Sequence, residues 1–325
     1  MILGIECTAH TFGVAVCKKG KILSNIRDMY KPESGGIIPA KSAEHHRRVA
    51  EILYIDALKI ACIEEKDIDA IALSNAPGLA PCLLAGRDFA REKANKLGIK
   101  IIPVNHCVAH LEIGRSLGAK DPVLLYASGA NTQIIAFASG KYRIFGETLD
   151  VGIGNFIDKF ARFTGIGFPG GPRIEEYAKN GKNYIELPYV VKGMDVSFSG
   201  IQTKLQQLYS AGAKIEDLSF SLQETVFAML VEAAERALAH TGKKELVLGG
   251  GVGCNARLQE MCKIMCKERG AKFFCPEKQY LVDNAGMVAF TGELMFRADK
   301  KCGIDSSKID IDARQRTDQV EVFWR

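Results

Sequence analysis

The order of the expected strands and helices most limits what this chain can fold into, because the same order occurs twice. Each half begins with three short antiparallel strands, after which helices alternate with strands. The pattern predicts these opening strands over 2–6, 12–17 and 21–29, and again over 123–127, 133–138 and 142–148. Such an order predicts a mixed sheet covered by helices. We therefore expect an α/β protein made of one unit used twice, with a cleft between the two copies.

The segments after each opening meander complete this division. The further expected elements are helices over 39–63 and from about 82 to 97, strands over 68–74, 100–105, 245–248 and 271–275, and a last helix near 284–299. We expect a first lobe over 1–120, with 284–325 packing back on it, and a second lobe over 121–283. Residues 163–200 are rich in Gly and Pro, and we expect an irregular insertion there that a ligand or partner orders.

The composition favours a compact, cytoplasmic protein without a membrane span. Hydrophobic residues make up 47% and charged residues 25% of the 325 residues, the balance of an ordinary globular protein. The N-terminus lacks the cationic start and cleavage site of a signal peptide. The uncharged run 122–140 has polar residues in its middle, so it predicts paired strands. Net charge is +5, which permits a polyanionic partner without demanding one.

The ten cysteines indicate a reducing compartment, because several of them stand singly inside apolar runs. Cys254, Cys262, Cys266 and Cys275 lie close in the sequence, but they contain no C-x-x-C pair. Buried free thiols are therefore favoured over a structural zinc site.

Three turns have the composition of anion-binding loops. Small and hydroxyl residues form the first turn of each half, at 7–9 and 128–132, where backbone N–H groups can approach an anion closely. The third is the glycine-rich stretch 249–255, which follows an expected strand and opens a helix. Each turn alone could equally be an ordinary connection. Residues 251–256 also match the loose dinucleotide pattern G-x-G-x-x-A, but Rossmann folds do not begin with a three-strand meander.

Two histidines and two carboxylates are candidates for chemistry. His106 and His110 are four residues apart, so on a helix both rings lie on one face and could bind a metal, or the helix simply carries two histidines. The glutamate of the zinc protease motif H-E-x-x-H is missing. Asp158 and Glu175 flank a Gly/Pro segment and could act as acid and base, bind ribose, or be solvated surface acids. The two histidines at 45–46 are expected on a solvated helix face.

Taken together, the motifs resemble one family. They are GIECTAHT (4–11), NHCVAH (105–110), YASGANTQ (126–133), FPGGP (168–172), SFSG (197–200), GGGVGCNARL (249–258) and DNAGM (283–287). This set is similar to that of the tRNA N6-adenosine threonylcarbamoyltransferases, in the archaeal and eukaryotic branch that supplies the catalytic subunit of KEOPS complexes and is related to bacterial TsaD. The resemblance spans nearly the whole chain.

The resemblance implies a duplicated actin/Hsp70-like (ASKHA, RNase H-like) ATPase fold and a reaction. The family moves threonylcarbamoyl from threonylcarbamoyl-adenylate to N6 of adenosine 37 in tRNAs that read ANN codons. It implies one divalent metal, iron or zinc, on His106, His110, Tyr126 and Asp283. It also places ATP, AMP or the adenylate on Tyr126, Ala127, Ser128, Gly129, Ala130, Asp158, Gly171, Glu175 and Asn255. The implied partners are tRNA and other KEOPS subunits, including an atypical protein kinase.

Two positions depart from the family pattern. Cys7 and Ala130 stand where glycine is common, so each adds a Cβ near an expected phosphate contact. Basic residues are also dispersed, so no concentrated tRNA-binding stripe is expected. The expected helix 86–100 is the best local candidate, with basic residues at 87, 91, 93 and 96, but the acids at 88 and 92 dilute it.

Three other functions remain open at this point. A kinase of the same fold class would need a catalytic carboxylate at the γ-phosphate, and no residue stands out for that role. A metalloprotease would need the missing glutamate. A non-catalytic, nucleotide-gated subunit that holds tRNA for a partner is the third.

Overall fold

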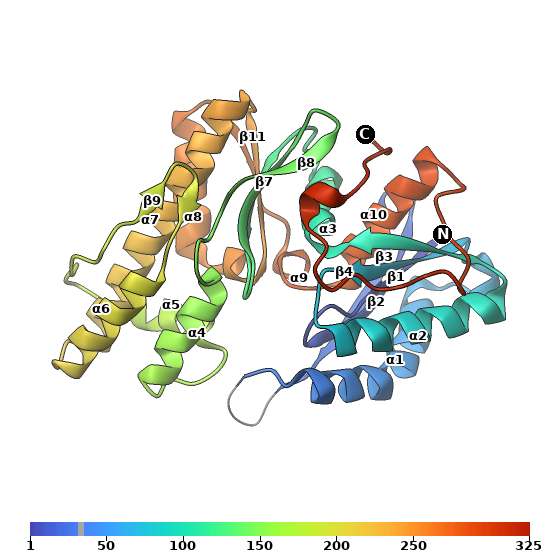
Figure 1. The fold of residues 1–325 in the computed structure, drawn as a ribbon, viewed down its shortest axis with the longest axis horizontal. Coiled ribbons are helices and arrows are strands. Elements are labelled where there is room, and N and C mark those ends of the chain that lie inside the picture. The colour runs from blue at the N-terminus through green and yellow to red at the C-terminus, as the bar shows by residue number, and fades with distance from the viewer. Residues whose placement is uncertain (32–35) are drawn as a thin grey trace. The chain divides into compact units, whose positions relative to one another are not determined.

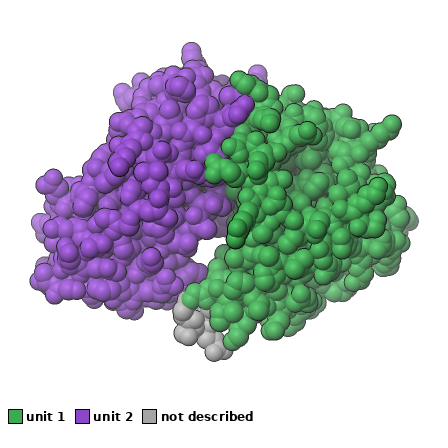
Figure 2. All heavy atoms as spheres, viewed as in Figure 1, with its two compact units in different colours: residues 1–117, 139–142, 283–325 green, residues 118–138, 143–282 purple. Residues whose placement is uncertain are grey.

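The computed structural model describes residues 1–31 and 36–325, and these divide into two compact units. Unit 1 comprises residues 1–117, 139–142 and 283–325, and unit 2 comprises 118–138 and 143–282. Figure 2 colours the two units separately. Asp283 and the last helix therefore belong to the unit that begins the chain.

Unit 1 is a mixed sheet with helices on both faces (Figure 1). The strands lie in the order β3-β2-β1-β4-β5, antiparallel within the meander and parallel from β1 to β5. The strands are β1 (Ile2–Glu6), β2 (Thr11–Lys18), β3 (Lys21–Met29), β4 (Ala70–Ala76) and β5 (Lys100–Asn105). The helices are α1 (Pro39–Ala61), η1 (Glu65–Asp67), α2 (Ala80–Leu97), α3 (His106–Glu112), η2 (Ile113–Leu117), α10 (Ala285–Ala298) and η4 (Thr317–Gln319).

The alternation of side chains along β1 decides which helices cover each face. Leu3 and Ile5 are fully buried in the core that α1 and α2 share with the sheet. Gly4 points to the other face, where a Cβ would lie 2.5 Å from the carbonyl oxygen of Ala285 and 2.6 Å from the amide nitrogen of Ala289. Glycine at this position therefore lets α10 lie directly on the central strand.

Unit 2 repeats the same sheet. Its order, β12-β11-β6-β7-β8, is again a three-strand meander followed by two parallel strands. The strands are β6 (Val123–Ala127), β7 (Thr132–Ala138), β8 (Lys141–Glu147), β11 (Glu245–Gly249) and β12 (Lys272–Phe274). The helices are α4 (Ile153–Phe163), α5 (Gly170–Ala178), α6 (Ser199–Ser210), α7 (Ile215–Thr241), η3 (Gly251–Cys254), α8 (Ala256–Glu268) and α9 (Lys278–Leu281). The predicted duplication is confirmed at the level of strand order.

The segment 163–200 is more regular than the sequence indicates. It contains α5 and a short hairpin of β9 (Val191–Lys192) and β10 (Asp195–Val196). Side chains from the rest of unit 2 hold it: the Asp217 carboxylate accepts hydrogen bonds from the backbone of Lys182 and Asn183, and Asp150 accepts them from Ser197 to Ser199. The chain therefore supplies part of the contacts that hold this segment, and a contribution from a ligand or partner stays a prediction.

Among the described helices, none combines the length and the apolar composition that crossing a bilayer requires. The described residues include all ten cysteines, and none of these forms a disulfide.

Candidate functional site

The carboxyl ends of two strands in unit 1 meet at a buried polar cluster. Strand β5 runs directly into α3, and the side chain of Asn105 caps that helix by accepting hydrogen bonds from the amides of Cys107 (3.0 Å) and Val108 (3.2 Å). Every residue of α3 is buried. The cap fixes where α3 starts, and therefore where His106, its first residue, projects.

His106, His110 and Asp283 form a compact group of possible metal ligands. The two rings lie 4.8 Å apart, as the four-residue spacing predicts. The Asp283 Oδ1 atom lies 3.3 Å from His106 Nε2 and 3.7 Å from His110 Nε2. The three ligand atoms are all within 4.8 Å of one another. Asp283 reaches this point because Asn284 caps α10 and so fixes the start of that helix.

The donor chemistry of this group fits a divalent metal. Two imidazole nitrogens and one carboxylate oxygen are a ligand set suited to zinc or iron. Burial lowers the pKa of His110, which favours the neutral imidazole that a metal needs. Burial alone would raise the pKa of Asp283, but the two histidines hold it well below its usual range. The carboxylate is therefore ionised and able to coordinate.

Glu6 joins this cluster from the end of β1. It is fully buried, and its Oε2 accepts a hydrogen bond from His106 Nδ1 at 2.9 Å. Its Oε1 accepts from the amide and the hydroxyl of Thr8, at 2.8 and 2.6 Å. No role for Glu6 was predicted from the sequence. A single carboxylate in an otherwise apolar strand could have indicated one, because buried carboxylates need partners.

Tyr126, the fourth expected metal ligand, lies on β6 in unit 2 and is buried. Its part in the metal site stays a prediction.

The residues expected to bind nucleotide all lie in unit 2, around the turn after β6 and the start of α8. Tyr126 and Ala127 end β6, and Ser128, Gly129 and Ala130 form the turn to β7, in which Gly129 and Ala130 are exposed. Gly250, with a φ of 89°, lies against this turn, because a Cβ there would be 2.3 Å from the Ala127 carbonyl oxygen.

Two of the expected nucleotide ligands have structural roles as well. Asn255 caps α8 by accepting from the amides of Arg257 and Leu258, and its amide group donates to Gln223 at 2.6 Å. Glu175 accepts from the amide of Ala256 at 2.9 Å. Asn255 therefore also stabilises the start of α8, and its contact with nucleotide stays a prediction.

Two others are near the start of α5, one on α4 and one on α5 itself. Asp158 accepts from the Gly170 amide at 2.8 Å. Gly171 is partly exposed, and no atom lies within 4 Å of where its Cβ would be. Gly171 therefore leaves open space beside the start of α5.

The first turn, Cys7 to Ala9, does not present the donors we expected. Both donors of Thr8 are used by Glu6. The side chain of Cys7 is fully buried and points at α2, where a Cβ on Gly86 would lie 2.1 Å from its sulfur. The Cys7 side chain is a packing element against α2.

The histidines at 45 and 46 are buried, with exposed fractions of 6% and 0%, so their predicted solvated position is wrong. They face β3 and β2: His45 bonds to Asp28 of β3 at 3.0 Å, and the His46 ring lies 5.4 Å from that of Phe12 of β2. Burial lowers the pKa of His46 to about 4.

The basic residues of α2 do not form a free stripe. Arg87 pairs with Asp310 at 2.9 Å, Lys93 with Glu51 at 2.6 Å, and Lys96 with Glu65 at 2.8 Å. Arg91 donates to the Ile309 carbonyl. The cations of α2 therefore pair within unit 1 itself, so the best local candidate for a tRNA-binding stripe does not offer free charges.

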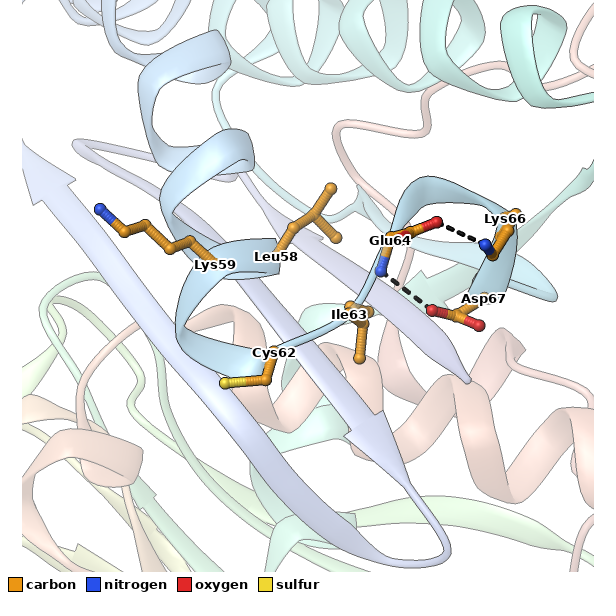
Figure 3. A pocket seen from close by; sticks show the side chains of 7 residues that line it. All are labelled: Leu58, Lys59, Cys62, Ile63, Glu64, Lys66 and Asp67. Carbon is orange, nitrogen blue, oxygen red and sulfur yellow. Dashed lines mark hydrogen bonds and ion pairs between the residues drawn. The ribbon is translucent and has the colours of Figure 1, made fainter.

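A surface depression of about 400 Å³ lies at the end of α1 and at η1 (Figure 3). Its charges pair with each other: Lys66 contacts Glu64 at 2.6 Å, and the Glu64 amide donates to Asp67 at 2.9 Å. It shares no residue with the cluster of Glu6, His106, His110 and Asp283.

Comparison with known proteins identifies the family. A family model described as TsaD, tRNA N6-adenosine threonylcarbamoyltransferase, matches residues 21–290. A Thermococcus kodakarensis protein named tRNA N6-adenosine threonylcarbamoyltransferase is 52% identical over 99% of both chains. A Methanosarcina mazei protein named as a probable bifunctional tRNA threonylcarbamoyladenosine biosynthesis protein is 51% identical over 99% of this chain, which spans 59% of that longer protein.

Solved structures support the fold. HypF of T. kodakarensis matches 91% of this chain and 47% of its own, with a TM-score of 0.65 and 16% identity. A Clostridium difficile 2-hydroxyisocaproyl-CoA dehydratase activator, solved with bound ADPNP, matches 92% of this chain and 97% of its own, with a TM-score of 0.56 and 11% identity. The predicted actin-like ATPase fold is confirmed. The chain belongs to the TsaD family of tRNA N6-adenosine threonylcarbamoyltransferases.

Proposed function

We propose that this transferase moves threonylcarbamoyl from threonylcarbamoyl-adenylate to N6 of adenosine 37 in tRNAs that read ANN codons, as the catalytic subunit of a KEOPS-type complex. The observation that carries this proposal is the 52% identity, over 99% of both chains, to a protein named for this transfer. The reaction forms the bond between N6 and the carbamoyl carbon. It breaks the bond from that carbon to phosphate oxygen, releases AMP and frees one proton from N6.

The transfer depends mainly on how the enzyme positions the two reactants. The N6 lone pair is delocalised into the adenine ring, so the amine is a weak nucleophile, whereas the carbamoyl-adenylate is an activated mixed anhydride. An enzyme accelerates such a step by orienting the two reactants and stabilising charge on the leaving group.

Unit 2 offers groups suited to the AMP part of the donor. The N-terminus of α8, which Asn255 caps, favours a phosphate, and so do the exposed amides of the turn at 129–130. Asp158 and Glu175 place carboxylates near the starts of α5 and α8, where ribose hydroxyls could donate to them.

Unit 1 offers the metal site. We propose that His106, His110 and Asp283 hold one divalent iron or zinc ion. When bound, such an ion supplies Lewis-acid stabilisation of a phosphate or carbamoyl oxygen. The chain's part is to hold two imidazoles and one carboxylate so that their ligand atoms lie within 4.8 Å of one another.

Nucleoside analysis tests the transfer. The chain, candidate partner subunits, unmodified tRNA and threonylcarbamoyl-adenylate are incubated, and the digested tRNA is examined by mass spectrometry. We expect threonylcarbamoyladenosine in tRNA with adenosine at position 37 and none in a matched tRNA with guanosine there. Partner-dependent release of AMP without a modified nucleoside would contradict the proposal, and a phosphorylated metabolite would favour the kinase.

A pair of glycine variants tests the nucleotide site. Gly171 and Gly200 are each the second residue of a helix, and no atom lies within 4 Å of where a Cβ on either would be. Both Gly→Leu variants should therefore fold. We expect Gly171→Leu to weaken AMP binding at least 10-fold in calorimetry and Gly200→Leu to leave it unchanged. Equal affinity in the two variants would remove Gly171 from the site.

A further inference from the structure

The environment of Glu6 is that of a fixed hydrogen-bond acceptor. It lies two residues after Gly4 on β1, on the face that α10 covers, and is fully buried. One oxygen is held by both donors of Thr8, and the other faces His106 Nδ1. A carboxylate with both oxygens engaged cannot rotate without losing a hydrogen bond.

We propose that Glu6 is a positioning residue that fixes the tautomer of His106, so that Nε2 presents its lone pair toward Asp283 and His110. This inference rests on the metal site of the proposed function. Neither the sequence pattern nor the names of the relatives assign Glu6 a role.

The hydrogen-bond roles support this assignment. An ionised carboxylate only accepts hydrogen bonds, so in the neutral ring the hydrogen must be on Nδ1. In this neutral ring His106 Nε2 carries the lone pair, whereas in the protonated ring Nε2 also has a hydrogen and pairs with Asp283 Oδ1, which lies 3.3 Å away. A metal ion between Nε2 and Asp283 replaces that hydrogen, while Nδ1–H stays bonded to Glu6. Carboxylates that bond the second nitrogen of a metal-binding histidine fix its tautomer in this way.

Substitution of Glu6 by glutamine should reverse the tautomer. The Thr8 amide cannot stop donating, so the single amide oxygen of glutamine is expected to stay with Thr8. The glutamine NH₂ group then faces His106 Nδ1, which must accept, and the hydrogen moves to Nε2. That nitrogen can no longer bind a metal unless the glutamine turns and leaves Thr8 unpaired.

The first test is the tautomer itself, in metal-free protein labelled with ¹⁵N-histidine and held at an alkaline pH at which the His106 ring is neutral. The His106 signals are assigned by their loss in His106→Ala. Long-range proton–nitrogen correlation should show Nδ1–H in the wild type and Nε2–H in Glu6→Gln. A wild-type His106 that carries its hydrogen on Nε2 would overturn the proposal, whether or not any variant folds.

The second test is cobalt(II) affinity, followed by the visible absorption of the bound ion. We expect Glu6→Gln to bind 10- to 100-fold more weakly than the wild type. Glu293→Gln is the matched control, since Glu293 is another buried carboxylate of unit 1, which instead accepts from the turn at Lys19 and Gly20. It should bind like the wild type.

The variant His110→Ala distinguishes a failure of the proposed metal site from a failure of the proposed role of Glu6. If it binds cobalt as tightly as the wild type, the proposed metal site itself fails. If it loses cobalt while Glu6→Gln keeps wild-type affinity and spectrum, only the role of Glu6 is refuted.

Discussion

Glu112, the last residue of α3, is the centre of a buried ionic cluster on which the position of the histidine helix depends. It is fully buried and contacts Arg325 Nε at 3.1 Å and Arg115 Nη1 at 3.0 Å, and it also accepts from the Tyr142 hydroxyl. The Arg325 side chain is only 8% exposed. Burial and the Glu112 charge raise the pKa of Tyr142 well above its usual value, so its hydroxyl stays protonated and donates.

We expect Glu112→Gln to be strongly destabilising. Removing one partner of a buried ion pair costs about 3–5 kcal/mol. Glutamine can still accept from Tyr142, so we take the lower end, about 3 kcal/mol. For a unit of this size that corresponds to a fall of roughly 6–12 °C in melting temperature. Differential scanning calorimetry measures it.

The matched control is Glu176→Gln, which breaks a pair with Lys179 whose side chains are 70% and 63% exposed. Exposed pairs contribute little, so this variant should melt within about 1 °C of the wild type. The double variant Glu112→Gln/Arg325→Met removes both buried charges and should regain part of the loss. A Glu112→Gln protein as stable as Glu176→Gln would refute the reasoning.

Three further predictions concern single residues. The pKa of His46 is about 4 in the folded chain and about 6.5 in the unfolded chain, so between these pH values the unfolded chain binds more protons. The free energy of unfolding of the wild type should therefore fall by about 2 kcal/mol from pH 7 to pH 5 in urea titrations. The His46→Phe variant should not show this contribution to the fall. Gly4→Ala should lower the free energy of unfolding by about 1–3 kcal/mol in the same assay, because the added Cβ would clash with the backbone of α10. A variant as stable as the wild type would contradict that packing. Asn255→Ala should lower stability by about 1 kcal/mol through loss of the α8 cap, apart from any effect on nucleotide affinity; an unchanged melting temperature would show that the cap contributes nothing.

The parts of the fold that depend on local pattern could be predicted from the sequence. Short apolar runs placed β1 and β5, and the repeated meander predicted a mixed sheet in both units. The spacing of His106 and His110 placed both rings on one face of α3. These features depend only on the periods of the strand and the helix.

The parts that depend on distant partners could not be predicted. The α2 cations look free in the sequence because Asp310, the partner of Arg87, is more than 200 residues away. His46 looked solvated because a histidine-rich helix face carries no sign of which side packs on the sheet. The role of Glu6 depends on His106, 100 residues later. Pairings of this kind are set by tertiary structure, and composition does not reveal them.

The central claim is that His106, His110 and Asp283 form one metal site on which transfer depends, and metal content tests it most directly. The wild type and variants are loaded with iron or zinc and dialysed, and bound metal is counted by plasma mass spectrometry. We predict about one ion per chain in the wild type and in the control His240→Ala, a histidine of α7 in the other unit. His110→Ala and Asp283→Ala should retain almost none. Full occupancy in those two variants would contradict the account.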